Sequence, residues 1–94
     1  GCSFSDKINN NGKILDVKRI NFLKKYLKAV HKAIKNGAKI KSYFVWSFLD
    51  NFEWALGYSK RFGIVHVDFK TLKRIPKKSY YFFGELIKKN SIPK

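Results

Sequence analysis

The chain has no methionine, one cysteine, two prolines and only six acidic residues in its 94 positions. Because Cys2 stands alone, it can form neither an intramolecular disulfide nor a multi-cysteine metal site, and we expect a cytoplasmic protein. Apolar runs are too short to span a bilayer, which argues against a membrane partner. No initiator residue or signal-peptide pattern accompanies Gly1, so we interpret the chain as a piece of a longer protein.

Histidine is scarce as well. His31 and His66 are far apart in the sequence, which argues against a metal site, and no pattern indicates a cofactor. We expect His31 to border the buried stripe of a helix and His66 to lie on one face of a strand.

The chain has 21 basic residues and only six acidic ones. Its net charge of +15 suggests a polyanionic partner such as nucleic acid. Only Arg19, Arg61 and Arg74 are arginines, whereas bidentate recognition of phosphates and base edges favours arginine. The lysines are spread over the whole chain. We therefore expect no nucleic-acid partner, and keep a basic module that binds single-stranded nucleic acid as an alternative.

The first half of the chain predicts a loop and then a helix. The polar start contains an Asn-Asn-Asn-Gly turn signal. From Val17 to Lys35, apolar residues recur at spacings of three and four, which predicts a helix with Asp16 as its N-cap and Asn36-Gly37 at its end. The apolar stripe comprises Ile20, Leu23, Leu27, Val30 and Ile34.

The second half predicts a buried strand, a short extended segment and a helix. Residues 40–48 are almost continuously apolar from Tyr43, which favours a strand covered on both faces. Residues 62–68 form the second extended segment, and Pro76 begins a helix over residues 77–89. The expected apolar side of this helix comprises Tyr80, Phe83, Leu86 and Ile87.

The order of helix, buried strand, loop and helix is typical of an α/β barrel or a doubly wound sheet. One buried strand needs hydrogen-bonded neighbours on both edges, so its partners are expected in sequence outside this chain. Residues 1–94 are accordingly predicted to be one segment of a larger domain, not an independent domain.

Aromatic and acidic residues are concentrated in the loop after the predicted strand, residues 46–63. A pyranose has an apolar face that packs on aromatic rings and a rim of hydroxyls that carboxylates bind. Trp46, Trp54 and Phe62 offer the first contact and Glu53 the second, which makes these four the candidate sugar-binding residues. From the residues alone, a packed core for the tryptophans and a solvated surface for Glu53 are the favoured interpretation.

Several separated blocks, agreeing in order and spacing over nearly all of the chain, resemble the carboxyl-terminal signature of family 1 glycoside hydrolases, the β-glucosidase family. The blocks are Asp16-Val17-Lys18-Arg19-Ile20, Phe44-Val45-Trp46-Ser47, Asp50-Asn51-Phe52-Glu53-Trp54, Gly57-Tyr58-Ser59-Lys60-Arg61-Phe62-Gly63, Val67-Asp68 and Lys73-Arg74-Ile75-Pro76-Lys77-Lys78-Ser79. The resemblance implies an α/β fold in which this chain is the carboxyl-terminal part, the last strand and flanking helices, of a (β/α)₈ TIM barrel.

The resemblance also implies a role for each candidate residue. Trp46 is implied to form the platform under the non-reducing sugar, and Glu53 to bind its 4- and 6-hydroxyls. Trp54 is implied to donate its indole N–H to the 3-hydroxyl, and Phe62 to form an aromatic wall. The implied partners are a small β-glycoside or oligosaccharide and the remainder of the parent barrel.

Retaining hydrolysis, the reaction of this family, uses a nucleophile and an acid/base carboxylate about 5–5.5 Å apart. The start of the chain resembles the residues that follow the nucleophile, which would lie two residues before Gly1, with the acid/base further upstream. No catalytic residue is therefore expected here. Asp50 and Glu53 are the carboxylates nearest the aromatic residues in sequence, and Asp50 is expected to fix the loop.

A terminal, unphosphorylated β-D-glucosyl residue is the favoured substrate. Family members that act on 6-phosphosugars usually carry small residues in place of Glu53 and Trp54, which are intact here, and Phe62 stands where tyrosine would be expected. A segment of a 6-phospho-β-glucosidase is the second alternative. Leu56 occupies a position that is often acidic or polar, which leaves the leaving-group subsite open.

Overall fold

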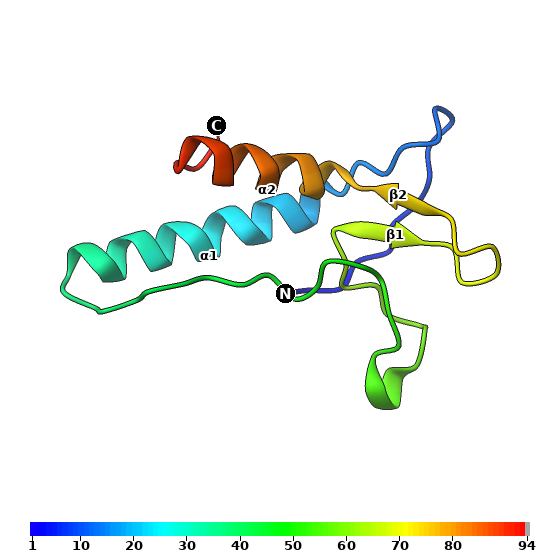
Figure 1. Cartoon of the computed structure of the whole chain (residues 1–94), viewed down its shortest axis with the longest axis horizontal. Helices are drawn as coiled ribbons and strands as arrows, with labels where there is room; N and C mark the ends of the chain where they lie inside the picture. The colour runs from blue at the N-terminus through cyan, green and yellow to red at the C-terminus, as the bar shows by residue number, and fades with distance from the viewer. Residues whose placement is uncertain (94) are drawn as a thin grey trace.

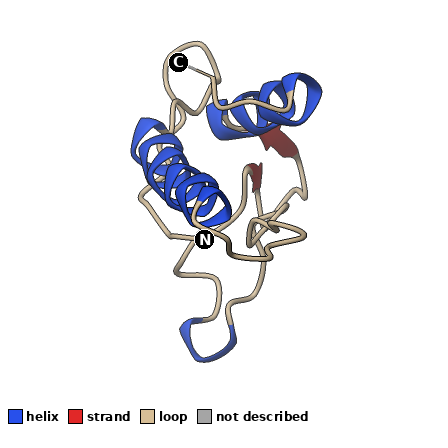
Figure 2. Cartoon of the chain, turned by 90° about the vertical axis from the view of Figure 1, so that its left-hand side faces the viewer, coloured by secondary structure: helices blue, strands red, loops and turns tan. Residues whose placement is uncertain are grey.

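The computed structural model describes residues 1–93, in which two helices are joined by a loop-rich middle and a short hairpin. Helix α1 spans Val17–Lys35 and α2 spans Lys78–Lys89, and a short 3-10 helix, η1, spans Trp54–Leu56. Strands β1 (Val65–Val67) and β2 (Arg74–Pro76) pair antiparallel. The helices lie side by side, and the loop that carries η1 projects away from both of them (Figures 1 and 2). No helix among the described residues is long and apolar enough to cross a membrane.

Helix α1 has the predicted bounds, and Gly37 adopts the expected left-handed conformation after it, with φ of 100°. The prediction that Asp16 caps the helix with its side chain is wrong. The Asp16 carboxylate instead accepts hydrogen bonds from Arg19 and from the backbone and hydroxyl of Ser79. The charge-assisted bond from the buried Arg19 guanidinium favours this orientation of the Asp16 carboxylate over one that caps the helix.

The core lies between α1 and α2, where Ile20, Leu23 and Phe82 are buried against one another. The predicted stripe on α1 is buried only in its first half, and Ile34 is 46% exposed. The reason is length: at 1.5 Å per residue, α1 with 19 residues is about 28 Å long and α2 with 12 residues about 18 Å. The last turns of α1 therefore extend beyond α2.

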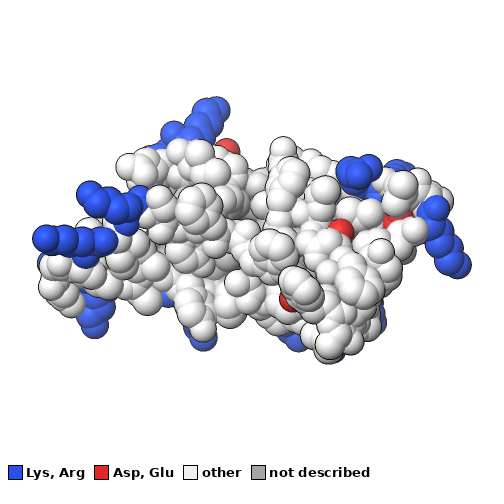
Figure 3. Space-filling model, turned by 60° about the horizontal axis from the view of Figure 1, so that its bottom comes forward, with Lys and Arg blue, Asp and Glu red and all other residues white. Residues whose placement is uncertain are grey.

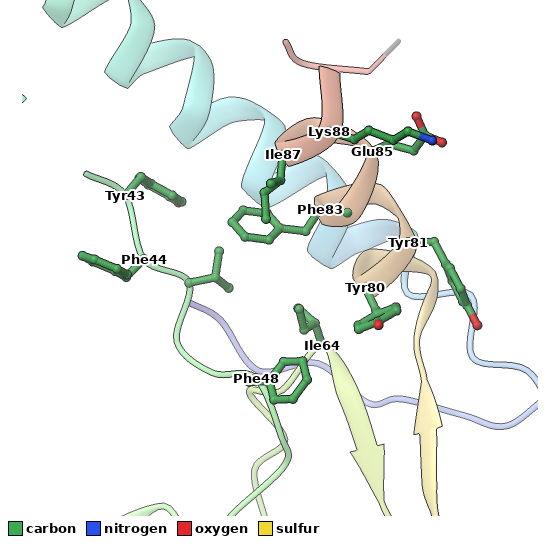
Figure 4. A pocket seen from close by; sticks show the side chains of 12 residues that line it. Tyr43, Phe44, Phe48, Ile64, Tyr80, Tyr81, Phe83, Glu85, Ile87 and Lys88 are labelled. Atoms are coloured by element: carbon green, nitrogen blue, oxygen red, sulfur yellow. The ribbon is translucent and has the colours of Figure 1, made fainter. Parts of the chain in front are cut away.

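The apolar side predicted for α2 is corrected in part. Phe82, which was not in the predicted set, is the buried residue that faces α1, whereas Tyr80 and Ile87 are exposed. Helix α2 has two apolar sides. Phe82 lies on the side that packs against α1, and the other side faces an open groove of about 650 Å³ (Figure 4). Side chains on opposite sides of this groove include Tyr43, Phe44, Phe48, Tyr80, Phe83 and Ile87.

The strand predicted over residues 40–48 is not formed within this chain. Within the described part, residues 39–46 make no backbone hydrogen bond, and Phe44 is 88% exposed rather than covered. Pairing begins only at Ser47, whose N–H donates to the Phe62 carbonyl at 3.1 Å, and at Leu49, which bridges Val65 in parallel. A strand requires edge partners, and the described residues supply one only from position 47 onward.

The hairpin agrees with the predictions in one strand and differs in the other. β1 lies inside the extended segment predicted over residues 62–68, and His66 lies in it as expected. β2 was not predicted. Pro76 ends β2 instead of starting the helix, and α2 begins two residues later at Lys78. Proline is tolerated there because a strand at the edge of a sheet needs no donor on its free side.

The chain is extended for its length. Its radius of gyration is 14.5 Å, compared with about 12 Å for a compact domain of this size. Among the described residues, seven apolar side chains are buried and seventeen large ones are exposed. Much of the apolar surface of this segment is therefore left uncovered by the segment itself.

Candidate functional site

The loop between β1 and the preceding extended residues closes on itself around η1. The Glu53 N–H donates to the Gly57 carbonyl at 2.7 Å, and the Leu56 N–H donates back to the Glu53 carbonyl at 2.8 Å. Trp54 and Gly57 have positive φ angles, of 42° and 58°. Glu53 and Trp54 thus begin a tight turn whose backbone is defined by its own hydrogen bonds.

Aromatic contacts brace this turn from the side of the hairpin. Phe52 and Tyr58 meet edge to face with centroids 5.2 Å apart, and Tyr58 packs on Phe69 at 4.4 Å. The Arg61 guanidinium lies 4.6 Å from the centre of the Phe69 ring, within the range of a cation–π contact. The stem of the loop is therefore anchored to the residues that follow β1.

The structure brings Trp46 and Glu53 into direct contact. The Trp46 indole Nε1–H donates to Glu53 Oε2 at 3.3 Å. Phe62 is half-buried. Its carbonyl accepts a hydrogen bond from the N–H of Ser47, the residue after Trp46, so the backbone of Phe62 adjoins the backbone next to Trp46. The peptide bond between Trp46 and Ser47 is cis.

The surroundings of the two tryptophans bear on the alternatives left open by the sequence. Trp46 is 55% exposed and Trp54 is 83% exposed, so neither is packed in a core within this chain. Glu53 is only half-exposed and is bonded to an indole, so it is not a freely solvated surface carboxylate. Exposed aromatic faces beside a positioned carboxylate are the combination that a sugar ring needs.

The first residue of the chain lies directly against Trp46. A Cβ atom built on Gly1 would fall 1.6 Å from the Trp46 carbonyl oxygen, so only glycine fits at this position. In Figure 1 the amino terminus meets the extended stretch before the η1 loop. Polypeptide that precedes Gly1 would therefore start next to the backbone of Trp46.

Asp50 fixes the loop, as predicted. Its buried carboxylate accepts from the Gly63 N–H at 2.9 Å, from Arg61 Nη1 at 2.7 Å and from Lys77 Nζ at 2.9 Å. Burial alone raises the pKa of the Asp50 carboxyl, but the bonds from Lys77 and Arg61 outweigh burial and hold that pKa below its ordinary value. Asp50 is therefore an ionised structural acceptor.

The comparisons with known proteins agree with this geometry. Residues 1–92 match the model of glycosyl hydrolase family 1. The chain belongs to glycosyl hydrolase family 1. Beta-glucosidase A of Acetivibrio thermocellus is 58% identical over 90 residues, which are 96% of this chain and 20% of the relative. A family 1 β-glucosidase from Thermotoga maritima superposes with a TM-score of 0.95 at 49% identity, over 98% of this chain and 21% of that one.

The family 1 chain is thus a segment of a TIM-barrel glycoside hydrolase, about one fifth of the length of these relatives. The Thermotoga maritima enzyme has also been solved in complex with deoxynojirimycin, and that structure superposes with a TM-score of 0.95 over 97% of this chain and 21% of its own length, at 49% identity. Membership of the family, together with the β-glucosidase names of these relatives, confirms the resemblance found in the sequence.

Sequence reasoning missed a buried network of charged side chains beneath the loop of this family 1 segment. Arg19 is 1% exposed and Lys77 is fully buried, although we expected the lysines mostly on the solvent-exposed faces of helices. Arg19 bonds to Asp6, Asp16 and the Arg61 carbonyl, and Lys77 bonds to Asp6, Asp50 and the Gly63 carbonyl. The spacing of Asp16 and Arg19 was a local signal, but nothing near Lys77 in the sequence indicates its distant partners.

Proposed function

We propose that this chain is the carboxyl-terminal, glycone-binding segment of a retaining β-glycosidase of the β-glucosidase type. The parent protein would hydrolyse terminal β-D-glucosyl residues of a small β-glycoside or oligosaccharide. The observation that carries the proposal is the contact between Trp46 and Glu53 in an exposed aromatic loop, in a chain that is 58% identical to a β-glucosidase over 90 residues.

The proposed division of labour follows from the donors and acceptors in this loop. The Trp46 indole occupies one oxygen of the Glu53 carboxylate, so the other oxygen and the free lone pairs are available to two neighbouring hydroxyls. The exposed faces of Trp46 and Trp54 are available to the C–H surface of the pyranose, and Trp54 has an indole N–H to donate to a hydroxyl. Phe62 would close the side of the subsite.

The bond-breaking groups of this mechanism belong to the parent and not to this segment. Retaining hydrolysis needs a nucleophile and an acid/base carboxylate. We place the nucleophile two residues before Gly1, and the approach of Gly1 to Trp46 supports this, because that position would lie beside the sugar subsite. The segment by itself is then a recognition surface without catalysis.

The remainder of the parent barrel would cover the surfaces that this chain leaves open. The groove between residues 43–48 and α2 is lined almost entirely by apolar and aromatic side chains. Residues 39–46 have no backbone hydrogen bond within the described part. Both features support the proposal that this segment completes its fold only with neighbouring strands and helices of the same protein.

The proposal is tested in the full-length parent by replacing Glu53 or Trp46 with alanine. Contacts to sugar hydroxyls tighten as the transition state forms, so each change should lower kcat/KM for an aryl β-glucoside by about 100-fold, equivalent to roughly 2.7 kcal/mol. Glu85→Ala is the matched control, because Glu85 is a carboxylate on α2, outside the sugar-facing loop, whose ion pair among the described residues is with Lys89. Wild-type kcat/KM in either loop variant would contradict the proposal.

A further inference from the structure

The loop that carries Glu53 is tied at both of its ends to one buried carboxylate, that of Asp50. Asp50 lies four residues after Trp46, and its two oxygens accept from Arg61 and from the Gly63 N–H, which flank Phe62 at the far end of the loop. The fit is close, since a Cβ atom on Gly63 would lie 2.4 Å from the Asp50 nitrogen. The ends of the loop therefore cannot separate while these bonds persist.

The same carboxylate is connected to two other parts of the chain. Lys77, at the start of α2, bonds to Asp50 Oδ1 at 2.9 Å and to Asp6 Oδ2 at 2.6 Å. Asp6 lies five residues after Gly1, which itself packs against Trp46. The network thus joins the sugar-facing loop to the segment that follows the proposed position of the nucleophile.

Stability alone is a poor reason for this arrangement. Buried ion pairs recover little more than the cost of taking their charges out of water, and apolar residues of similar size often serve as well or better. What a set of directional bonds provides, and apolar packing does not, is a fixed orientation between segments. The segments joined here are those that carry the sugar-binding groups and the start of the chain.

We propose that Asp50 and Arg61 are positioning residues that set the place of the Glu53 carboxylate relative to the start of the chain, and thereby the selectivity for the sugar's 6-hydroxymethyl group. The inference rests on the proposed function. Neither Asp50 nor Arg61 is proposed to contact the substrate. Their effect on the reaction passes through Glu53 and Trp46.

The test compares two substrates in the full-length parent protein. A 4-nitrophenyl β-D-xyloside lacks the hydroxymethyl group of the corresponding glucoside, so the ratio of the two kcat/KM values reports how well that group is bound. This ratio does not depend on the fraction of enzyme that is folded. A loss of structure alone would lower both values equally, whereas a displaced Glu53 would lower the value for the glucoside more.

Asp50→Asn is the principal variant, because it is nearly isosteric but removes the charge that holds Arg61 and Lys77. The glucoside-to-xyloside ratio should fall about tenfold, a loss close to the lower limit for a hydrogen bond to a charged group. Arg61→Lys should lower the ratio in the same direction, since Arg61 Nη1 donates to both Asp50 and the Val67 carbonyl, and the shorter lysine side chain does not bring its ammonium to the same place. Asp68→Asn is the matched control, since asparagine can still accept from the backbone of Lys70 and Thr71.

Several results would overturn the inference, and one would contradict the proposed function. A wild-type ratio in Asp50→Asn and Arg61→Lys would refute the positioning role. If circular dichroism shows that both variants are unfolded, the role of these residues is purely structural and the inference fails. An equal fall in Asp68→Asn would show that the effect is unspecific. If Glu53→Ala itself leaves the ratio unchanged, the assignment of Glu53 fails; if Glu53→Ala abolishes the preference and Asp50→Asn does not alter it, this inference alone fails.

Discussion

His66 shows how strongly single residues depend on the charge network. It lies in β1 with 7% of its surface exposed, and its Nδ1 atom has no hydrogen-bond partner among the described residues. Burial lowers the pKa of His66, the positive charges of Arg61 and Lys77 lower it further, and the carboxylates of Asp50 and Asp6 oppose them. His66 is therefore held in its neutral form.

A pH dependence of stability follows from this shift. Because the pKa of His66 is lower in the folded protein, the unfolded chain binds the proton more readily as the pH falls below about 6.5, and the folded state loses stability. The contribution is fully present above that pH and is lost toward acid. In the parent protein, His66→Gln should show a smaller loss of unfolding free energy between about pH 7.5 and pH 5 than wild type. Equal losses, measured by urea denaturation at each pH, would contradict it.

The sequence predicted some individual residues and missed others for a physical reason. Trp46, Glu53, Trp54 and Phe62 stood out because aromatic rings and a carboxylate, the groups that bind a pyranose, lie close together in the sequence. Their roles toward a sugar stay a prediction. The buried state of Lys77 could not be predicted, because its partners lie 71 and 27 residues away and meet only after folding.

Elements differ in how far local sequence determines them. The bounds of α1 were predicted correctly because helical bonds connect residues four apart, so the pattern and the stop signal at Gly37 are both local. A strand takes its backbone bonds from another segment, which explains why the predicted strand over residues 40–48 is unpaired before Ser47 among the described residues. β2 was missed because three residues that include a proline give almost no signal.

The contact between α1 and α2 yields a prediction at this scale. Leu23 is 1% exposed in the core against Phe82, so Leu23→Ala should lower the unfolding free energy of the parent protein by about 2–5 kcal/mol. Lys25→Ala, on the exposed face of the same helix, should change it by no more than about 0.5 kcal/mol. Urea denaturation of the two variants is the measurement, and equal midpoints would show that this core contributes nothing in the parent.

At the scale of the whole molecule, charge and apolar surface are distributed differently. On the face in Figure 3, lysine and arginine side chains lie toward the ends and edges, while uncharged residues cover the middle. The net charge of +15 does not by itself indicate this arrangement. The open apolar groove beside α2 fits a segment that is covered by the rest of a barrel better than it fits a free-standing basic module.

The central claim is that sugar recognition lies in this chain and bond cleavage lies in the rest of the parent. It is tested most directly by measuring aryl β-glucoside hydrolysis with the full-length parent and with the purified 94-residue chain at equal molar concentration. We predict turnover by the parent and none above the buffer rate by the chain, because the proposed function assigns the nucleophile and the acid/base to the rest of the parent. Turnover by the chain alone, or none by the parent, would contradict the account.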